Sequence, residues 1–136
     1  METFKRYSET ADKEINYIVC SDLDTLLWLA NLAALEMHIT LSKVEAYEEP
    51  DIVLFDLDPE PPAGFYEAAE VALSLKEKLE DLGFKVFVKT SGKKGLHVTM
   101  PFERGYSFHQ TREFVHQFGR HLSRENPMIV SERSQS

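Results

Sequence analysis

Two aspartates stand one residue apart at the end of an apolar run in residues 51–60, DIVLFDLDPE. Side chains two positions apart on a strand share a face, with Cα atoms about 6.5–7 Å apart, so Asp56 and Asp58 should project together. Two carboxylates this close oppose each other's ionisation, and a divalent cation removes that conflict. Mg²⁺ and Mn²⁺ prefer carboxylate oxygens together with waters and substrate phosphates. The pair therefore indicates a metal site, unless Asp58 merely opens the proline-rich turn and Asp56 caps local backbone.

A second group of residues with chemical potential lies in the segment KTSGKKGLHV, residues 89–98. Gly92 and Gly95 allow positive φ and close approach of the backbone to a ligand, and successive N–H groups in such a turn can hold an anion. Ser91 adds a hydroxyl, Lys94 adds a compact positive charge, and His97 on the outgoing strand is placed to face the same anion. The glycine spacing is not that of a Walker loop. The alternative is a plain hairpin turn with exposed lysines.

Together, the two groups predict a nucleotide–metal site. Carboxylates hold a divalent cation, a basic turn holds phosphates, and such a cation can activate an attacking oxygen and stabilise a leaving one.

The surrounding sequence predicts alternating strands and helices. The expected elements, in chain order, are a strand at 15–20, a helix at 21–38, a strand at 51–58, a helix at 65–82, a strand at 84–90, a strand at 96–100, a helix from Ser107 to Glu125 and a short strand at 127–130. Apolar content makes the helix at 21–38 mostly buried and the strand at 51–58 central in its sheet. The fold class is α/β (α+β), a mixed sheet with packed helices.

Several helix details follow from local signals. Ser21 with Asp24 and Ser107 with Gln110 have capping-box spacing, and Gly83 should end the helix at 65–82. That helix is expected to turn one set of residues toward the core: Ala69, Ala72, Leu73, Leu79 and Leu82.

Composition narrows the class of protein. A chain of 136 residues suits one domain, no run approaches the ~20 apolar residues of a membrane helix, and the N-terminus lacks a signal-peptide core. Cys20 is the only cysteine, which excludes an internal disulfide; a cytoplasmic protein is the simplest interpretation. The net charge is −8, yet residues 85–124 carry 8 basic against 2 acidic side chains. That section is either a face for a polyanion or ordinary solvated surface charge.

Three stretches in order resemble one known family: LLWLANLAALEMH at 26–38, DLDP at 56–59 and KTSGKKGLHV at 89–98. They resemble the polymerase domain of the DNA ligase D family, in the archaeo-eukaryotic primase superfamily, over residues 15–130. The resemblance implies Mn²⁺- or Mg²⁺-dependent nucleotidyl transfer to a primer end in non-homologous end joining, with nucleoside triphosphate and DNA ends as partners. It also implies a separate ligase and an end-binding protein beside this chain.

Residue roles carry over from the family motifs. Asp56 and Asp58 resemble the metal-binding catalytic acids. Six residues resemble the nucleotide-binding set: His38, Ser91, Gly92, Lys94, Gly95 and His97. Without the family, His38 would be interpreted as a histidine at a helix C-terminus, where the macrodipole favours it.

The sequence also departs from the family. The family's domain is about twice this length, with a basic N-terminal part and a third metal-binding aspartate that have no counterpart here. The chain is therefore expected to be a truncated or naturally reduced core, with weak or absent polymerisation by itself. The alternatives are a non-catalytic nucleotide- or DNA-end-binding module acting with a separate ligase, using Phe87, Phe102 or Tyr106 for stacking, and a metal-dependent phosphohydrolase.

Overall fold

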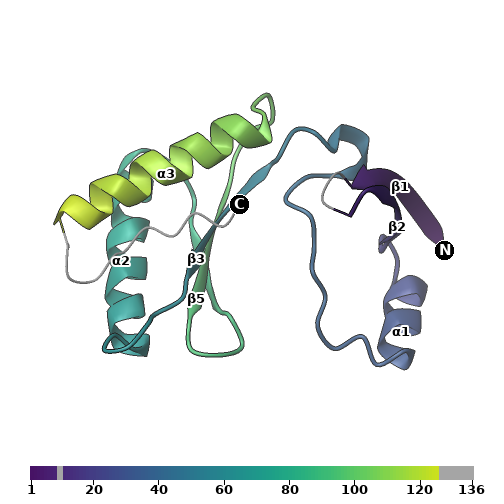
Figure 1. Ribbon diagram of the computed structural model, residues 1–136, viewed down its shortest axis with the longest axis horizontal. Helices are drawn as coiled ribbons and strands as arrows, with labels where there is room; N and C mark the ends of the chain where they lie inside the picture. Colours follow the sequence, from purple (N-terminus) through teal and green to yellow (C-terminus); the bar gives the residue numbers. More distant parts are fainter. Residues whose placement is uncertain (9–10, 126–136) are drawn as a thin grey trace. The chain divides into compact units, whose positions relative to one another are not determined.

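The computed structural model describes residues 1–8 and 11–125. The chain divides into two compact units, Met1–Thr40 and Leu41–Ser136. Figure 1 shows the first unit as a strand pair and one helix, and the second as a sheet with two long helices. The described elements confirm an α+β fold class with helices packed on a sheet. The strand expected at 127–130 lies outside the described residues.

The first unit begins with an antiparallel pair of strands. β1 (Glu2–Ser8) pairs with β2 (Lys13–Val19), with Glu2 opposite Val19 and Ser8 opposite Lys13. The expected strand at 15–20 is thus present, starting two residues earlier. β1 was not predicted, because ETFKRYS is mainly polar and carries little of the apolar alternation that indicates a strand.

The helix of the first unit is shorter than its sequence predicts. α1 (Leu23–Asn31) begins at Asp22, whose side chain accepts a hydrogen bond of 2.7 Å from the Thr25 N–H, so the cap is Asp22 and not Ser21. The expectation of a helix to residue 38 is wrong, because the chain leaves the helix in a turn where Ala33 has φ +57°. The expectation that the helix is mostly buried is also wrong, since Thr25 is its one buried residue.

The second unit contains a three-stranded antiparallel sheet. After the short 3₁₀ helix η1 (Val44–Ala46), β3 (Ile52–Leu57), β4 (Phe87–Thr90) and β5 (Leu96–Pro101) align in the order β3-β5-β4. β5 is central among the described strands, and the prediction of a central β3 is wrong. The misleading signal was the apolar residues on both faces of β3: one face is buried, and Ile52 and Leu54 on the other are half-buried.

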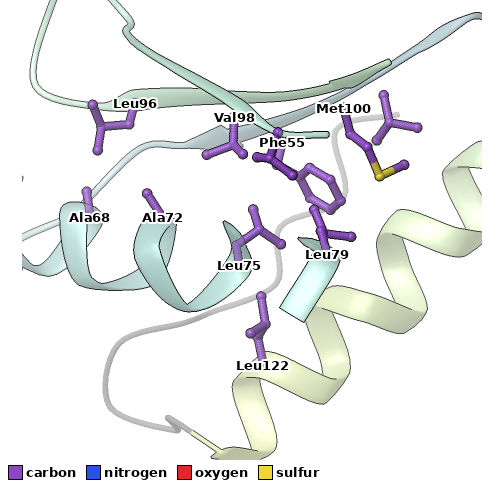
Figure 2. Close-up of a cluster of buried hydrophobic side chains, with 11 residues drawn as sticks. Phe55, Ala68, Ala72, Leu75, Leu79, Leu96, Val98, Met100 and Leu122 are labelled. Carbon is purple, nitrogen blue, oxygen red and sulfur yellow. The ribbon is translucent and has the colours of Figure 1, made fainter. Parts of the chain in front are cut away.

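Two helices cover one face of this sheet. α2 (Phe65–Asp81) and α3 (Phe108–Glu125) pack with the strands around a single cluster that includes Leu75, Leu79, Val98 and Leu122 (Figure 2). In the described part of the chain, every buried apolar residue belongs to the second unit. Phe55 of β3 packs edge-on against Phe118 of α3, with ring centroids 6.2 Å apart.

The core face of α2 differs in part from the prediction. Its buried residues are Ala68, Val71, Ala72, Leu75 and Leu79. Leu73 and Leu82, expected in the core, are 60% and 62% exposed. Positions 68, 71, 72, 75 and 79 form one 3.6-residue stripe, and Leu73 falls outside it.

The predicted helix ends of the second unit are confirmed. Gly83 follows α2 with φ +89°. The Ser107 N–H donates to Gln110 Oε1 (2.8 Å) and the Gln110 N–H donates to Ser107 Oγ (3.3 Å), which is the predicted capping box of α3. Across the described residues, no helix combines the length and the apolar character that a membrane crossing requires.

Candidate active site

Strand register brings the first of the two acids to the basic segment. Asp56 of β3 is paired with His97 of β5, and His97 is paired on its other side with Lys89 of β4. The His97 Nε2 lies 3.5 Å from Asp56 Oδ1. Side chains along β5 alternate, so that Leu96 and Val98 are buried and His97 between them lies on the other face. Asp56, His97 and Lys89 therefore form a row on the sheet face that α2 and α3 leave open.

The second acid lies one residue beyond the strand and faces the turn. Asp58 follows the end of β3, and its Oδ1 is 3.8 Å from Lys94 Nζ. Both side chains are largely in water, at 65% and 55% exposed. Each acid thus lies close to one side chain of the 89–98 segment, and the two predicted groups lie at the same end of the sheet.

The turn that carries Lys94 is closed by its own hydrogen bonds. The Ser91 N–H donates to the Gly95 carbonyl (3.0 Å), and the Gly95 N–H donates to Ser91 Oγ (3.2 Å). Because Ser91 Oγ is an acceptor here, its own proton remains available for a phosphate oxygen.

Both glycines are required, each for one of the two predicted reasons. Gly92 has φ +90°, a conformation that glycine adopts without strain. Gly95 lies against β3: a Cβ at this position would be 2.4 Å from the Leu57 carbonyl oxygen. The close approach of Gly95 to Leu57 fixes the turn beside Asp58, the next residue.

The two acids could provide part of the ligand set of a hard divalent cation. Two exposed carboxylates at a strand end offer the oxygen ligands that Mn²⁺ and Mg²⁺ prefer. No cluster of three or more His, Cys, Asp or Glu side chains suited to a metal occurs in residues 1–8 and 11–125. Asp56 and Asp58 can therefore supply two ligands, and the remaining positions would belong to waters and phosphate oxygens.

His38 is the one predicted site residue that lies in the first unit. It follows α1 outside the helix, is 87% exposed at its side chain, and has its Nε2 3.4 Å from Glu36 Oε1. The helix-terminus interpretation is wrong, because α1 ends at Asn31. Its role near a nucleotide stays a prediction.

Lys89 was not assigned from sequence, whereas Phe87, Phe102 and Tyr106, the residues suggested for stacking, are found to line one groove. Lys89 lies beside His97 because β4 and β5 pair as a hairpin. The predicted turn at 91–95 would have been enough to derive this pairing. The groove, of about 1150 Å³, lies at the opposite end of the sheet, where β4 begins and β5 ends. Its aromatic lining is Phe84, Phe87, Phe102, Tyr106 and Phe114. Phe87 and Tyr106 are 58% and 54% exposed, and Lys85 and Glu103 are the charged residues of the lining.

Comparison with known proteins matches the sequence of this chain to one family. The family described as LigD, primase-polymerase domain, matches residues 1–136. The bifunctional non-homologous end joining protein LigD of Bacillus subtilis is 32% identical over 121 residues, which cover 88% of this chain and 20% of that protein. The multifunctional LigD of Pseudomonas aeruginosa is 32% identical over 107 residues, covering 76% of this chain and 12% of that protein.

A solved structure agrees with the sequence comparisons. The polymerase domain of Mycobacterium tuberculosis ligase D, in complex with DNA, superposes with a TM-score of 0.85 at 25% identity. The match covers 98% of this chain and 49% of that one, so the chain spans about half of that domain and a fifth or less of the two relatives above. The chain belongs to the LigD primase-polymerase domain family.

Proposed function

We propose that this chain is the nucleotide- and metal-binding core of a polymerase that adds nucleotides to primer ends in non-homologous end joining. One observation carries the proposal: the two acids and the glycine-flanked lysine turn converge, with Asp58 and Lys94 3.8 Å apart and Asp56 and His97 3.5 Å apart. Carboxylates for a cation and cations for phosphates therefore occupy one end of one sheet face. This arrangement is suited to a nucleoside triphosphate bridged to the protein by a divalent cation.

The acidic residues of the site would bind the metal ion, and its hydrogen-bond donors would bind the phosphates. Asp56 and Asp58 would hold Mn²⁺ or Mg²⁺, which when bound supplies charge neutralisation at the pyrophosphate and activation of the primer 3′-hydroxyl. Ser91 donates its free hydroxyl proton to a phosphate oxygen, and Lys94 neutralises phosphate charge. The His97 side chain is 24% exposed and lies on the central strand, so its position in the site is fixed. Fixed donors of this kind orient the triphosphate for attack.

DNA is the proposed second substrate. The solved neighbour is a polymerase domain in complex with DNA. Residues 85–124 of this chain carry most of its basic side chains, and Lys89 extends the row beside His97 along β4. These charges favour contact with a phosphate backbone near the nucleotide.

Nucleotide binding tests the site directly. Calorimetry with ATP and Mn²⁺ should show binding to the wild-type chain, a loss of at least tenfold in affinity for Asp56→Ala, and no change for Glu77→Ala. Glu77 is an exposed acid on α2, the helix that packs on the sheet face opposite the site. Glu77→Ala therefore removes the same charge as Asp56→Ala, but at a distance from the site. Equal affinities for wild type and Asp56→Ala would overturn the assignment.

Primer extension with Mn²⁺ and each nucleotide set tests the reaction. We expect weak extension by this chain alone, since two acids and not three are gathered in its described residues, and we expect Asp56→Ala to abolish it. Robust extension that survives Asp56→Ala would remove the catalytic assignment.

The groove favours a second candidate function, a non-catalytic module that binds DNA ends beside a separate ligase and end-binding protein. Phe87 and Tyr106 expose aromatic faces at the groove, and base stacking on such faces binds single strands without sequence preference. Affinity for single-stranded DNA that is unchanged by ATP, Mn²⁺ and Asp56→Ala would favour this module over the polymerase core.

A further inference from the structure

The two close side-chain contacts in the site join residues that the proposed function assigns to different ligands. Asp58, a proposed metal ligand, contacts Lys94, a proposed phosphate ligand, at 3.8 Å. Asp56, the other metal ligand, contacts His97 at 3.5 Å. Each acid of the proposed metal site thus lies beside one residue of the proposed phosphate site, and Lys94 is the positively charged one.

We propose that Lys94 is an exchangeable counter-ion of Asp58, which couples the binding of metal and triphosphate. This inference rests on the proposed function. Lys94 Nζ lies 3.8 Å from Asp58 Oδ1, so a divalent cation held by Asp58 would compete with Lys94 for this carboxylate. If a divalent cation and a triphosphate bound together, Lys94 would leave Asp58 and its ammonium group would contact the phosphates.

The geometry of the turn allows the Lys94 side chain to change partner while the backbone stays in place. The backbone beside Lys94 is fixed, because Gly95 lies against Leu57 and is closed onto Ser91 by hydrogen bonds in both directions. The side chain itself is 55% exposed and can rotate. His97 cannot exchange in the same way, because it lies on the central strand of the sheet and is 24% exposed. Lys94 is therefore the residue that changes partner.

The exchange predicts opposite effects of one substitution on the two ligands. Lys94 and the metal compete for Asp58, so removing the lysine charge should tighten the binding of metal alone. Lys94 and the phosphates attract, so the same change should weaken the binding of the metal–triphosphate complex. A lysine that only bound phosphate, without contact to Asp58, would affect the second measurement alone.

Lys93 provides the matched control. It stands in the same turn, carries the same charge and is exposed, and no ion pair of Lys93 is present in the part of the chain that the structure describes. Lys93→Gln and Lys94→Gln therefore make the same change in net charge, and only Lys94→Gln removes the contact with Asp58. Lys94→Arg keeps the charge near Asp58 and should restore wild-type binding of metal alone.

The experiment titrates each full-length variant with Mn²⁺ alone, following free Mn²⁺ by electron paramagnetic resonance. It then measures ATP binding at saturating Mn²⁺ by equilibrium dialysis. We expect Lys94→Gln to bind Mn²⁺ roughly two- to fivefold more tightly than Lys93→Gln, the range expected for removing one exposed ion pair that competes with the metal. We expect it to bind Mn²⁺–ATP more weakly than Lys93→Gln. Asp58→Asn should abolish the Mn²⁺ response.

The outcomes separate the two levels of the argument. Equal Mn²⁺ affinities for Lys94→Gln and Lys93→Gln, with Mn²⁺–ATP still bound by the wild type, would overturn the counter-ion exchange and leave the proposed function standing. Mn²⁺ binding that Asp58→Asn does not change, or absent binding in both wild type and Lys94→Gln, would overturn the proposed function and the exchange together.

Discussion

Replacing Gly95 by alanine tests whether the close approach of the turn to β3 holds the site together. The added Cβ would meet the Leu57 carbonyl oxygen at 2.4 Å and its carbon at 3.3 Å, whereas ordinary contacts lie at 3.4–4 Å. The clash involves backbone atoms, so no side-chain rotation relieves it and the strands must separate by about 1 Å. Leu57 and Leu96 form the last register pair of β3 and β5, and this pair should open first.

The expected loss follows from the size of this overpacking. Forcing one carbon into a filled position costs about 1–3 kcal/mol, which for a chain of this size lowers Tm by roughly 4–12 °C. The same displacement moves Lys94 away from Asp58 and should weaken Mn²⁺–ATP binding. Thermal unfolding by circular dichroism and calorimetry with Mn²⁺–ATP measure the two effects on one sample.

Gly64→Ala is the control for adding a methyl group to a glycine. Gly64 is the N-cap of α2 with φ −135°, and a Cβ there would be 3.5 Å from Glu67 Oε2, an ordinary contact. Its stability loss should stay below about 1 kcal/mol, with no change in nucleotide affinity. If Gly95→Ala is no less stable than Gly64→Ala and binds Mn²⁺–ATP as the wild type does, the turn does not depend on this contact and the reasoning is refuted.

Three further predictions concern the core, the first unit and the acids. Leu75→Ala, at a fully buried position, should lower the free energy of unfolding by about 2–5 kcal/mol, while exposed Leu73→Ala should leave it nearly unchanged in urea denaturation. Hydrogen bonding from the Thr25 N–H lowers the pKa of Asp22, so the stabilisation of α1 is present above the unfolded pKa of about 3.9 and is lost as pH falls through the lower folded pKa. Far-UV circular dichroism should show less helix in Asp22→Ala than in wild type at neutral pH, with the difference disappearing as pH falls and Asp22 of the wild type is protonated; equal helix content at neutral pH would contradict it. Mn²⁺ should raise the urea midpoint of wild type and leave that of Asp56→Asn unchanged, because only a cation bound to the native state stabilises it.

The candidate site residues can be named from the sequence because their signals are local. The D-x-D spacing predicts that Asp56 and Asp58 lie at a strand end, and the two glycines predict a tight turn. Both predictions can be made without knowing the order of the strands in the sheet. The antiparallel pairing of β3 with β5, which brings His97 to Asp56, is a long-range contact. Nothing in either strand alone specifies that register, so the convergence of the two groups remained a hypothesis until the strands were paired.

Two of the errors, the core position of Leu73 and the length of the first helix, come from relying on apolar side chains alone. Hydrophobic periodicity identifies apolar side chains but not the partner that buries them. Leu73 fits a helical stripe as well as Leu75 does, yet the strands cover only the stripe of Leu75. The apolar residues after Asn31 likewise favour a longer helix, and a single left-handed residue, Ala33, ends it.

In the second unit, the residues of the core and the residues of the candidate site lie on opposite faces of the sheet. Along β5, Val98 is fully buried beneath the helices, and its neighbour His97 points to the open face toward Asp56. We therefore expect a substitution on the covered face to change the free energy of unfolding, and one on the open face to change the proposed ligand binding. Gly95 is the exception, because its backbone carries Lys94 on one side and contacts the Leu57 carbonyl on the other. A change in the packing of this turn should therefore also change the distance between Asp58 and Lys94, the lysine proposed to bind phosphate.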